Sequence, residues 1–331
     1  MFHNYFFLKR LANSLNQQLK GLALLECFSQ NKDELILGFA NEEKEFIVRA
    51  NLDPNVSLLQ FPEDFSRAGK NSVDLFKELI DQEVASVEEF SYERSFQVVF
   101  QNGDRLIFKM HARRANILHG RDSKVISLFK KNLSQDSQIE LSSLHKKLDI
   151  SRDQFRSIGS DPLELIPALG KESKIYLERK GYYELDEGEK WTALNDLLSA
   201  LEENPIHLLE SPLRISLLNK DPNSTNDPIA ATNWLYEKTV RSFYFDKEKQ
   251  QVVNQLKQKI KKSENYISKN QEKLVQIEES RSPEEIANIL MANLHQIQTG
   301  LSKVVLTDIY NNEPITIKLN TSLTPQKNAE N

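Results

Sequence analysis

A regular spacing of apolar side chains between residues 253 and 277 constrains this chain more than any other feature. Successive positions alternate in steps of three and four residues, which is the spacing of the a and d positions of a coiled coil: Val253, Leu256, Ile260, Ser263, Ile267, Asn270, Leu274 and Ile277. Such a seam needs a partner helix. Polar residues within it weaken association but fix register. We therefore expect an arm that projects, rather than a dimerisation zipper.

The segment after this seam predicts a helix, a β-hairpin and the start of another helix. Ser282-Pro283-Glu284-Glu285 has the pattern of a capping box, and Gly300 is expected to end the helix that follows. The runs 304–306 and 315–319 predict a hairpin at the base of the arm. Thr324 resembles an N-cap and Pro325 the first residue of a helix. Because a helix begins there, we expect the chain to be the N-terminal part of a longer protein.

Length and composition exclude several classes of protein. A chain of 331 residues predicts two or three domains, and its net charge of -5 argues against a uniformly basic nucleic-acid-binding protein. Cys27 is the only cysteine, so neither a disulfide framework nor a thiolate zinc cluster is expected. The sequence shows no signal peptide and no apolar run of about 20 residues. We therefore expect a cytoplasmic protein with no membrane partner.

The first part of the chain contains two similar halves. Leucines at positions 8, 11, 15 and 19 predict a helix, followed by strands near 23–28, 34–39, 45–50 and 57–61. A second helix is predicted from Val73, Phe76, Leu79 and Ile80, followed by strands near 84–90, 95–100, 105–110 and 116–120. Asn102-Gly103 is the strongest hairpin signal. Two helix-plus-strand repeats predict an antiparallel sandwich with flanking helices.

Residues 134–205 change to a helical pattern. The run from Leu163 to Lys171 resembles a helix-hairpin-helix, although Ala168 stands where glycine is usual, and a plain helical hairpin explains it equally well. Its turn would present backbone N–H groups to a phosphate. The phosphate-binding residues we predict are Ala168, Leu169, Gly170, Lys171 and Lys174. The expected fold is α+β, with a sandwich domain in residues 1–133, a helical domain in 134–212, and a connector, arm helix and hairpin in 213–331.

Local charge and chemical motifs favour binding over catalysis. Between residues 105 and 131 we find one acidic residue and eight basic ones, which are Arg105, Lys109, Arg113, Arg114, Arg121, Lys124, Lys130 and Lys131. The simpler explanation is a solvated face. No glycine-rich nucleotide loop, no HExxH pattern among the six histidines and no GxSxG motif occurs. We expect no catalytic residue, no metal and no cofactor.

A set of ordered motifs near the C-terminal end resembles the NFACT family. They are residues 294–300 (LHQIQTG), 308–310 (DIY), 314–319 (PITIKL), 324–325 (TP) and 328–329 (NA). A weaker resemblance extends back to residue 1. Family members were formerly described as fibronectin-binding proteins and are associated with ribosome quality control, where they bind obstructed large subunits and tRNA. The resemblance implies rRNA of the large ribosomal subunit and tRNA or peptidyl-tRNA as partners.

The resemblance also implies site residues. The family usually has an Asp-Arg pair implicated in tRNA contact and tailing, and Glu93-Arg94 stands at the matching place. Residues 113–117 are similar to the family's Gly-Arg-His-Ser-Asn-Ile segment, and residues 3–5 correspond to its opening Phe-Asp-Gly. The tRNA-binding residues implied are Asn4, Glu93, Arg94, Arg113, Arg114 and Asn116. The arm residues expected to contact the ribosome are Lys257, Lys259, Lys261 and Lys262.

Three functions are compatible with these patterns. The first is a non-catalytic RNA-binding scaffold of ribosome quality control, with C-terminal tailing in the full-length protein as a further expectation. The second is a fibronectin-binding adhesin. The third is a nucleic-acid-processing enzyme of glycosylase-like fold. Formamidopyrimidine-DNA glycosylases attack through an N-terminal proline, but this chain has Phe2 and His3 there, so that route is excluded.

Overall fold

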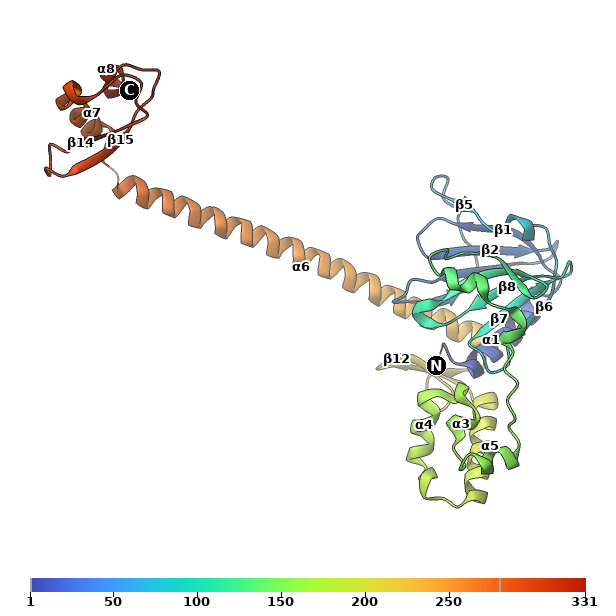
Figure 1. Ribbon diagram of the computed structural model, residues 1–331. Coiled ribbons are helices and arrows are strands. Elements are labelled where there is room, and N and C mark those ends of the chain that lie inside the picture. Colours follow the sequence, from blue (N-terminus) through green and yellow to red (C-terminus); the bar gives the residue numbers. More distant parts are fainter. Residues whose placement is uncertain (1, 280) are drawn as a thin grey trace. The chain divides into compact units, whose positions relative to one another are not determined.

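The computed structural model describes residues 2–279 and 281–331, and for residues 278 and 279 it describes the backbone alone. The chain divides into two compact units, Met1–Asp246 and Lys247–Asn331. The fold is mixed α+β, with several antiparallel sheets and one long helix (Figure 1). The domain boundaries expected near residues 133 and 212 stay a prediction.

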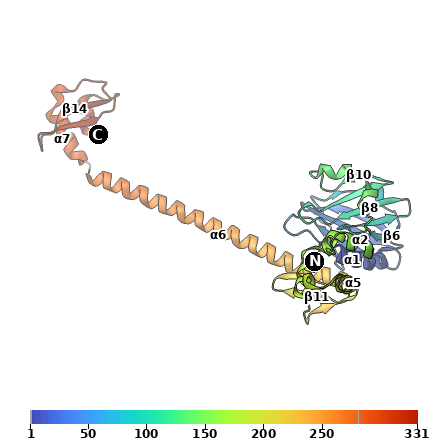
Figure 2. The ribbon, with the colours of Figure 1, turned by 60° about the horizontal axis from the view of Figure 1, so that its bottom comes forward.

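The first unit begins with helix α1 (Tyr5–Leu19) and two five-stranded antiparallel sheets. The first sheet has the order β4-β3-β2-β1-β5, and its strands are β1 (Ala23–Ser29), β2 (Glu34–Ala40), β3 (Glu45–Asn51), β4 (Leu58–Gln60) and β5 (Val73–Asp74). The second has the order β10-β9-β8-β7-β6, and its strands are β6 (Val84–Glu89), β7 (Ser95–Phe100), β8 (Asp104–Lys109), β9 (Asn116–Arg121) and β10 (Lys124–Leu128). Apolar residues of both sheets and α1 form one core. Figure 2 shows α1 next to the strands of the second sheet.

The predicted strands up to residue 120 are confirmed, whereas the predicted second helix is wrong. Residues 73–80 form the short strand β5 and the 3-10 turn η1 (Lys77–Leu79). Phe76 has a φ of 48°, in the left-handed region, which a continuing α-helix cannot accommodate. The two halves therefore share their strand pattern, and only the first is preceded by an α-helix.

Short helices follow the second sheet and lie together beside α1 (Figure 1). The α-helices are α2 (Arg152–Ser157), α3 (Pro162–Leu165), α4 (Gly170–Arg179) and α5 (Glu187–Glu203). The 3-10 turns among and before them are η2 (Ala112–Arg114), η3 (Ser134–Gln138), η4 (Leu141–Leu144), η5 (Pro167–Leu169) and η6 (Tyr182–Glu184). A three-stranded sheet that the sequence did not predict comes next, with β11 (Ile206–Glu210), β12 (Leu213–Ser216) and β13 (Ser224–Thr225).

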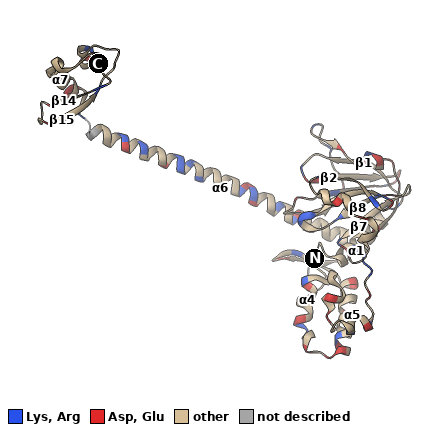
Figure 3. Cartoon of the chain, in the orientation of Figure 1, with Lys and Arg blue, Asp and Glu red and all other residues tan. Residues whose placement is uncertain are grey.

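Helix α6 (Pro228–Glu279) is 52 residues long and extends into the second unit. Four of its seam residues, Leu256, Ile260, Ile267 and Leu274, are 53–57% exposed. Lysine and arginine residues are spread along the same helix (Figure 3). The exposure of these apolar seam residues agrees with the predicted need for a partner helix.

The second unit also contains α7 (Pro283–Ala292), η7 (Leu294–Gln296), the hairpin β14 (Lys303–Thr307) and β15 (Pro314–Lys318), and α8 (Pro325–Glu330). Ser282 and Glu285 form the predicted capping box, and the hydroxyl of Thr324 accepts from the N–H of Lys327 as an N-cap. The prediction that Gly300 ends the first of these helices is wrong, because α7 ends at Ala292. A small core centred on Ile289 and Leu290 joins the elements.

Candidate functional site

A cavity of the first unit lies where the turn before β7 meets the start of α4. Its volume is about 540 Å³. The walls come from three separate parts of the chain, which are the N-terminus (Phe2, His3, Asn4), the turn between β6 and β7 (Tyr92, Glu93, Arg94) and residues Pro167–Glu172, with Lys146 beside them. Two sets of residues predicted separately, Asn4 with Glu93-Arg94 and Ala168–Lys171, therefore line one cavity.

Asn4 joins the N-terminus to the turn before α4. Its side-chain oxygen accepts from the N–H of Phe6 at 2.9 Å, which caps α1. Its amide nitrogen donates to the carbonyl oxygens of Ala168 at 3.0 Å and Leu169 at 3.3 Å. The amide therefore fixes the wall that carries Lys171. An asparagine suits this position because it can accept on one side and donate on the other.

Gly170 lets the chain turn into α4. It has a φ of 70°, and a Cβ at this position would lie 3.6 Å from Nδ2 of Asn4. The strain of that φ for other residues accounts for glycine here. The first N–H groups of α4, including that of Lys171, have no carbonyl partner one turn earlier in their own helix. The lysine side chain is exposed.

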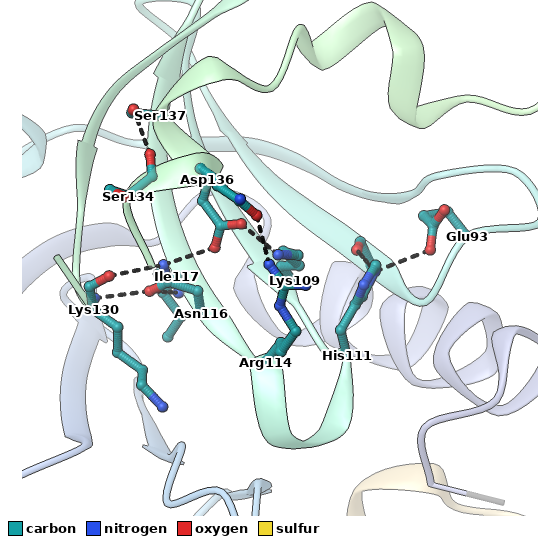
Figure 4. Close-up of polar contacts among 12 residues, drawn as sticks. Glu93, Lys109, His111, Arg114, Asn116, Ile117, Lys130, Ser134, Asp136 and Ser137 are labelled. Carbon is teal, nitrogen blue, oxygen red and sulfur yellow. Dashed lines mark hydrogen bonds and ion pairs between the residues drawn. The ribbon is translucent and has the colours of Figure 1, made fainter. Parts of the chain in front are cut away.

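Glu93 is the most enclosed charged residue of the cavity, with 9% of its surface exposed. One carboxylate oxygen lies 3.0 Å from Nε2 of His111, and the other lies 2.8 Å from Nζ of Lys146. Figure 4 shows the contact with His111. Burial alone would raise the pKa of Glu93, but hydrogen bonds from His111, Lys146 and the backbone of Arg94 lower it to about 2. The carboxylate is therefore ionised at neutral pH.

His3 also lines the cavity. Its Nδ1 lies 3.2 Å from the carbonyl oxygen of Met110, and this hydrogen bond requires that Nδ1 carry a proton. Burial lowers the pKa of His3 to about 4, although the hydrogen bond to Met110 opposes the shift. The positive charge of Arg94 contributes to the lowering of this pKa. His3 is therefore neutral at physiological pH.

Arg94 is exposed. Its backbone N–H donates to Oε1 of Glu93 at 2.9 Å, and its carbonyl accepts from the N–H of Met110. Within residues 2–279 and 281–331, the guanidinium group of Arg94 forms no hydrogen bond or ion pair. A guanidinium in this state can bind a phosphate through two parallel N–H donors.

Other predicted residues lie outside the cavity. Arg113 and Arg114 are exposed on η2, where Nη2 of Arg114 donates to Gln135 at 3.0 Å. Lys174 lies on the exposed side of α4, 3.9 Å from Glu178. Asn116 is fully buried, and its amide bonds to the backbone of Ile117 and Lys130 and to Asp136 (Figure 4). Asn116 therefore holds strands together and has no free group for a ligand.

The basic stretch 105–131 carries less free charge than its composition suggests. Lys109 is paired with the buried Asp136, and Arg121 with the buried Asp104. Lys130 donates from its buried ammonium group to the carbonyl of Leu52. Asp104 and Asp136 lie just outside residues 105–131. A count over that range therefore overstates the positive charge that is free to bind a ligand.

The structure adds residues to the site that the sequence did not indicate, namely Tyr92, His111 and Lys146. Lys146 is 53 positions from Glu93 in the sequence, so no local spacing could reveal the pair. His111 follows β8, and Tyr92 precedes Glu93 with a φ of 57°. Among the described residues, no group of histidines, cysteines and acidic residues could hold a metal ion. No helix within residues 2–279 and 281–331 is long and apolar enough to cross a membrane.

Two solved structures share this fold. They are the fibrinogen-binding protein from Staphylococcus aureus, with a TM-score of 0.53 at 12% identity, and the N-terminal part of the fibronectin/fibrinogen-binding protein FBPS from Streptococcus suis, with a TM-score of 0.50 at 13% identity. Each comparison covers 71% of this chain and 99% of the other. At such identities the likeness concerns the fold.

Sequence comparison relates part of the chain to known proteins. The chain is 31% identical over 116 residues to the Rqc2 homolog RqcH of Streptococcus pneumoniae serotype 2 (strain D39 / NCTC 7466). This stretch covers 33% of the chain and 20% of the relative, so the match spans about a fifth of the curated protein. Residues 179–331 match the family model of the NFACT N-terminal and middle domains. Residues 179–331 are therefore similar to the N-terminal and middle domains of the NFACT family, and part of the chain is distantly similar to RqcH.

Proposed function

We propose that this chain is a non-catalytic RNA-binding part of a ribosome quality-control factor, and that it binds tRNA or peptidyl-tRNA on the obstructed large ribosomal subunit. The observation that carries the proposal is the shared cavity. Arg94 and the start of α4 with Lys171 lie on its walls, and each supplies donors suited to a phosphate. The relationship to RqcH supports the partners.

The arm has a separate role in this proposal. Lys257, Lys259, Lys261 and Lys262 are exposed on α6, where they can bind rRNA phosphates while the apolar seam packs against a second helix. The cytoplasmic location and the absence of a cofactor belong to the same proposal. The names of the two solved structures describe what those proteins bind, and at 12% and 13% identity they support the fold only.

Binding of labelled tRNA tests the proposal. Arg94→Ala should weaken binding by about tenfold, since a charged contact to phosphate is lost. Arg156→Ala is the matched control, because Arg156 is an exposed arginine of the same unit that lies outside the cavity. Unchanged tRNA affinity in Arg94→Ala, with the protein still folded, would contradict the proposed site.

Co-sedimentation addresses the ribosome. After translation is stalled in cells, the full-length protein should pellet with large subunits that carry peptidyl-tRNA. If the protein were recovered only in the fraction without ribosomes, the result would contradict the large ribosomal subunit as its partner.

A further inference from the structure

The carboxylate of Glu93 is fully occupied, although an arginine is its immediate neighbour. Oε1 contacts Nε2 of His111 at 3.0 Å and accepts from the backbone N–H of Arg94 at 2.9 Å, while Oε2 contacts Nζ of Lys146 at 2.8 Å. A carboxylate next to an arginine can orient the guanidinium group. In the structure the carboxylate of Glu93 contacts the ring of His111 and the ammonium group of Lys146 instead.

Lys146 is held firmly at this point of the chain. Its own N–H donates to the carbonyl of Ser91 at 3.1 Å, in the turn that leads to Glu93. The ring of the preceding residue, His145, lies 4.9 Å from that of Phe90. These contacts fix the backbone of Lys146 beside the turn, so its ammonium group starts close to the carboxylate and loses little freedom on pairing.

The charge of Glu93 matters because both residues line the same cavity. An unpaired carboxylate there would attract the guanidinium of Arg94 and would repel an incoming phosphate. The ammonium group of Lys146 and the contact with His111 counter both effects. The cavity then presents the cationic side chains of Arg94 and Lys171, while its other acid, Glu172, is hydrogen-bonded to Ser216 and Asn219.

We propose that Lys146 is a positioning residue, which occupies the Glu93 carboxylate and thereby leaves the Arg94 guanidinium free for a phosphate of the bound RNA. This inference rests on the proposed function for its ligand. Lys146 acts through Glu93, so its role depends on the acidic group. A lysine that contacted the RNA itself would matter equally with or without Glu93.

A double-variant comparison separates these two roles. Lys146→Met should lower tRNA affinity about tenfold, because it leaves the buried carboxylate short of a cation. Lys146→Arg should retain binding. In the Glu93→Gln background the same Lys146→Met change should cost less than twofold, since no negative charge remains to be held. An equal loss in both backgrounds, or no loss in either, would overturn the proposal.

Lys238→Met provides the matched control. Lys238 pairs with Glu210 at 3.0 Å, and its side chain is 51% exposed, as is that of Lys146. This pair lies outside the cavity. The control should therefore retain wild-type affinity, and thermal unfolding of every variant checks that the fold is intact.

Chemical labelling tests the same inference without RNA. Phenylglyoxal modifies accessible arginine side chains, and mass spectrometry reports the rate at Arg94. We expect the rate to fall at least threefold in Lys146→Met, as the released carboxylate pairs with the guanidinium, and to recover when Glu93→Gln is added. An unchanged rate in Lys146→Met would refute the positioning role. If the wild type bound no tRNA, the proposed function would fail, and the labelling rates would still decide the role of Lys146.

Discussion

The side-chain amide of Asn4 donates to the carbonyl oxygen of Ala168 at 3.0 Å, so the first residues of the chain are joined to a turn 164 positions away. The same side chain caps α1 through its oxygen. One residue therefore stabilises a helix end and fixes the cavity wall next to Gly170 and Lys171.

Asn4→Asp separates these two contributions. Aspartate is an equally good N-cap, but its second oxygen would face the carbonyls of Ala168 and Leu169 in place of a donor. We expect a loss of about 1–3 kcal/mol in the free energy of unfolding, measured with urea. Ser151→Asp, at the N-cap of α2, is the control and should have little effect. Equal stability of Asn4→Asp and wild type would contradict the bridging role.

Lowering the pH should weaken the contacts of the Glu93 carboxylate with His111, Lys146 and the backbone of Arg94. The pKa of Glu93 in the folded protein is about 2, below its ordinary value of 4.5, so its contribution to stability is complete above about pH 4.5 and is lost as the pH falls toward 2. Unfolding free energies measured at several pH values should fall less steeply for Glu93→Gln than for the wild type. If the unfolding free energies of the two proteins fell equally steeply below pH 4.5, the contacts of Glu93 would not stabilise its charged carboxylate.

The strands could be predicted from the sequence because their apolar or alternating runs are local. Residues 34–39 and 95–100, for example, form interior strands of their sheets that are buried along most of their length. The helix predicted at residues 73–80 failed because its apolar spacing is shared by a strand and a turn, and because the N–H of Leu75 pairs with Cys27 in a distant strand. Tertiary pairing decided the structure there.

The candidate site was predictable only in parts. Asn4, Glu93 and Arg94 came from one pattern and Ala168 to Lys171 from another, and neither pattern could indicate that they line one cavity. Lys146, a partner of Glu93, lies 53 positions away in the sequence, after the last strand of the second sheet. Asn116 was chosen as a contact residue, yet its amide is fully used inside the protein. Long-range packing carries the information that local spacing lacks.

The buried ion pair between Lys109 and Asp136 should be sensitive to the loss of either partner. Asp136 is 2% exposed and also accepts from Nδ2 of Asn116. Asp136→Leu leaves a buried ammonium group and a buried amide without their acceptor, so we expect a loss of about 3–5 kcal/mol in the free energy of unfolding. Glu187→Leu removes the exposed partner of Arg156 and should cost less than about 1 kcal/mol. Similar costs in both variants would contradict this assignment.

The arm and the cavity should be separable by mutation. Replacing Lys257, Lys259, Lys261 and Lys262 with glutamine removes four exposed charges from α6. Co-sedimentation with large ribosomal subunits should decrease, while tRNA affinity should change less than twofold, because the substitutions lie outside the cavity. Glutamine at Lys303 and Lys318, both exposed on the hairpin, is the control. Retained sedimentation of the α6 variant would exclude these lysines as ribosome contacts.

The salt dependence of tRNA binding tests the central claim most directly, because it reports how many phosphates the protein neutralises. The logarithm of the wild-type binding constant should fall linearly with the logarithm of the salt concentration, and the slope should be smaller by about 1 in Arg94→Ala. Arg156→Ala should keep the wild-type slope. Binding that does not depend on salt, or an identical slope in wild type and Arg94→Ala, would contradict a phosphate-binding cavity.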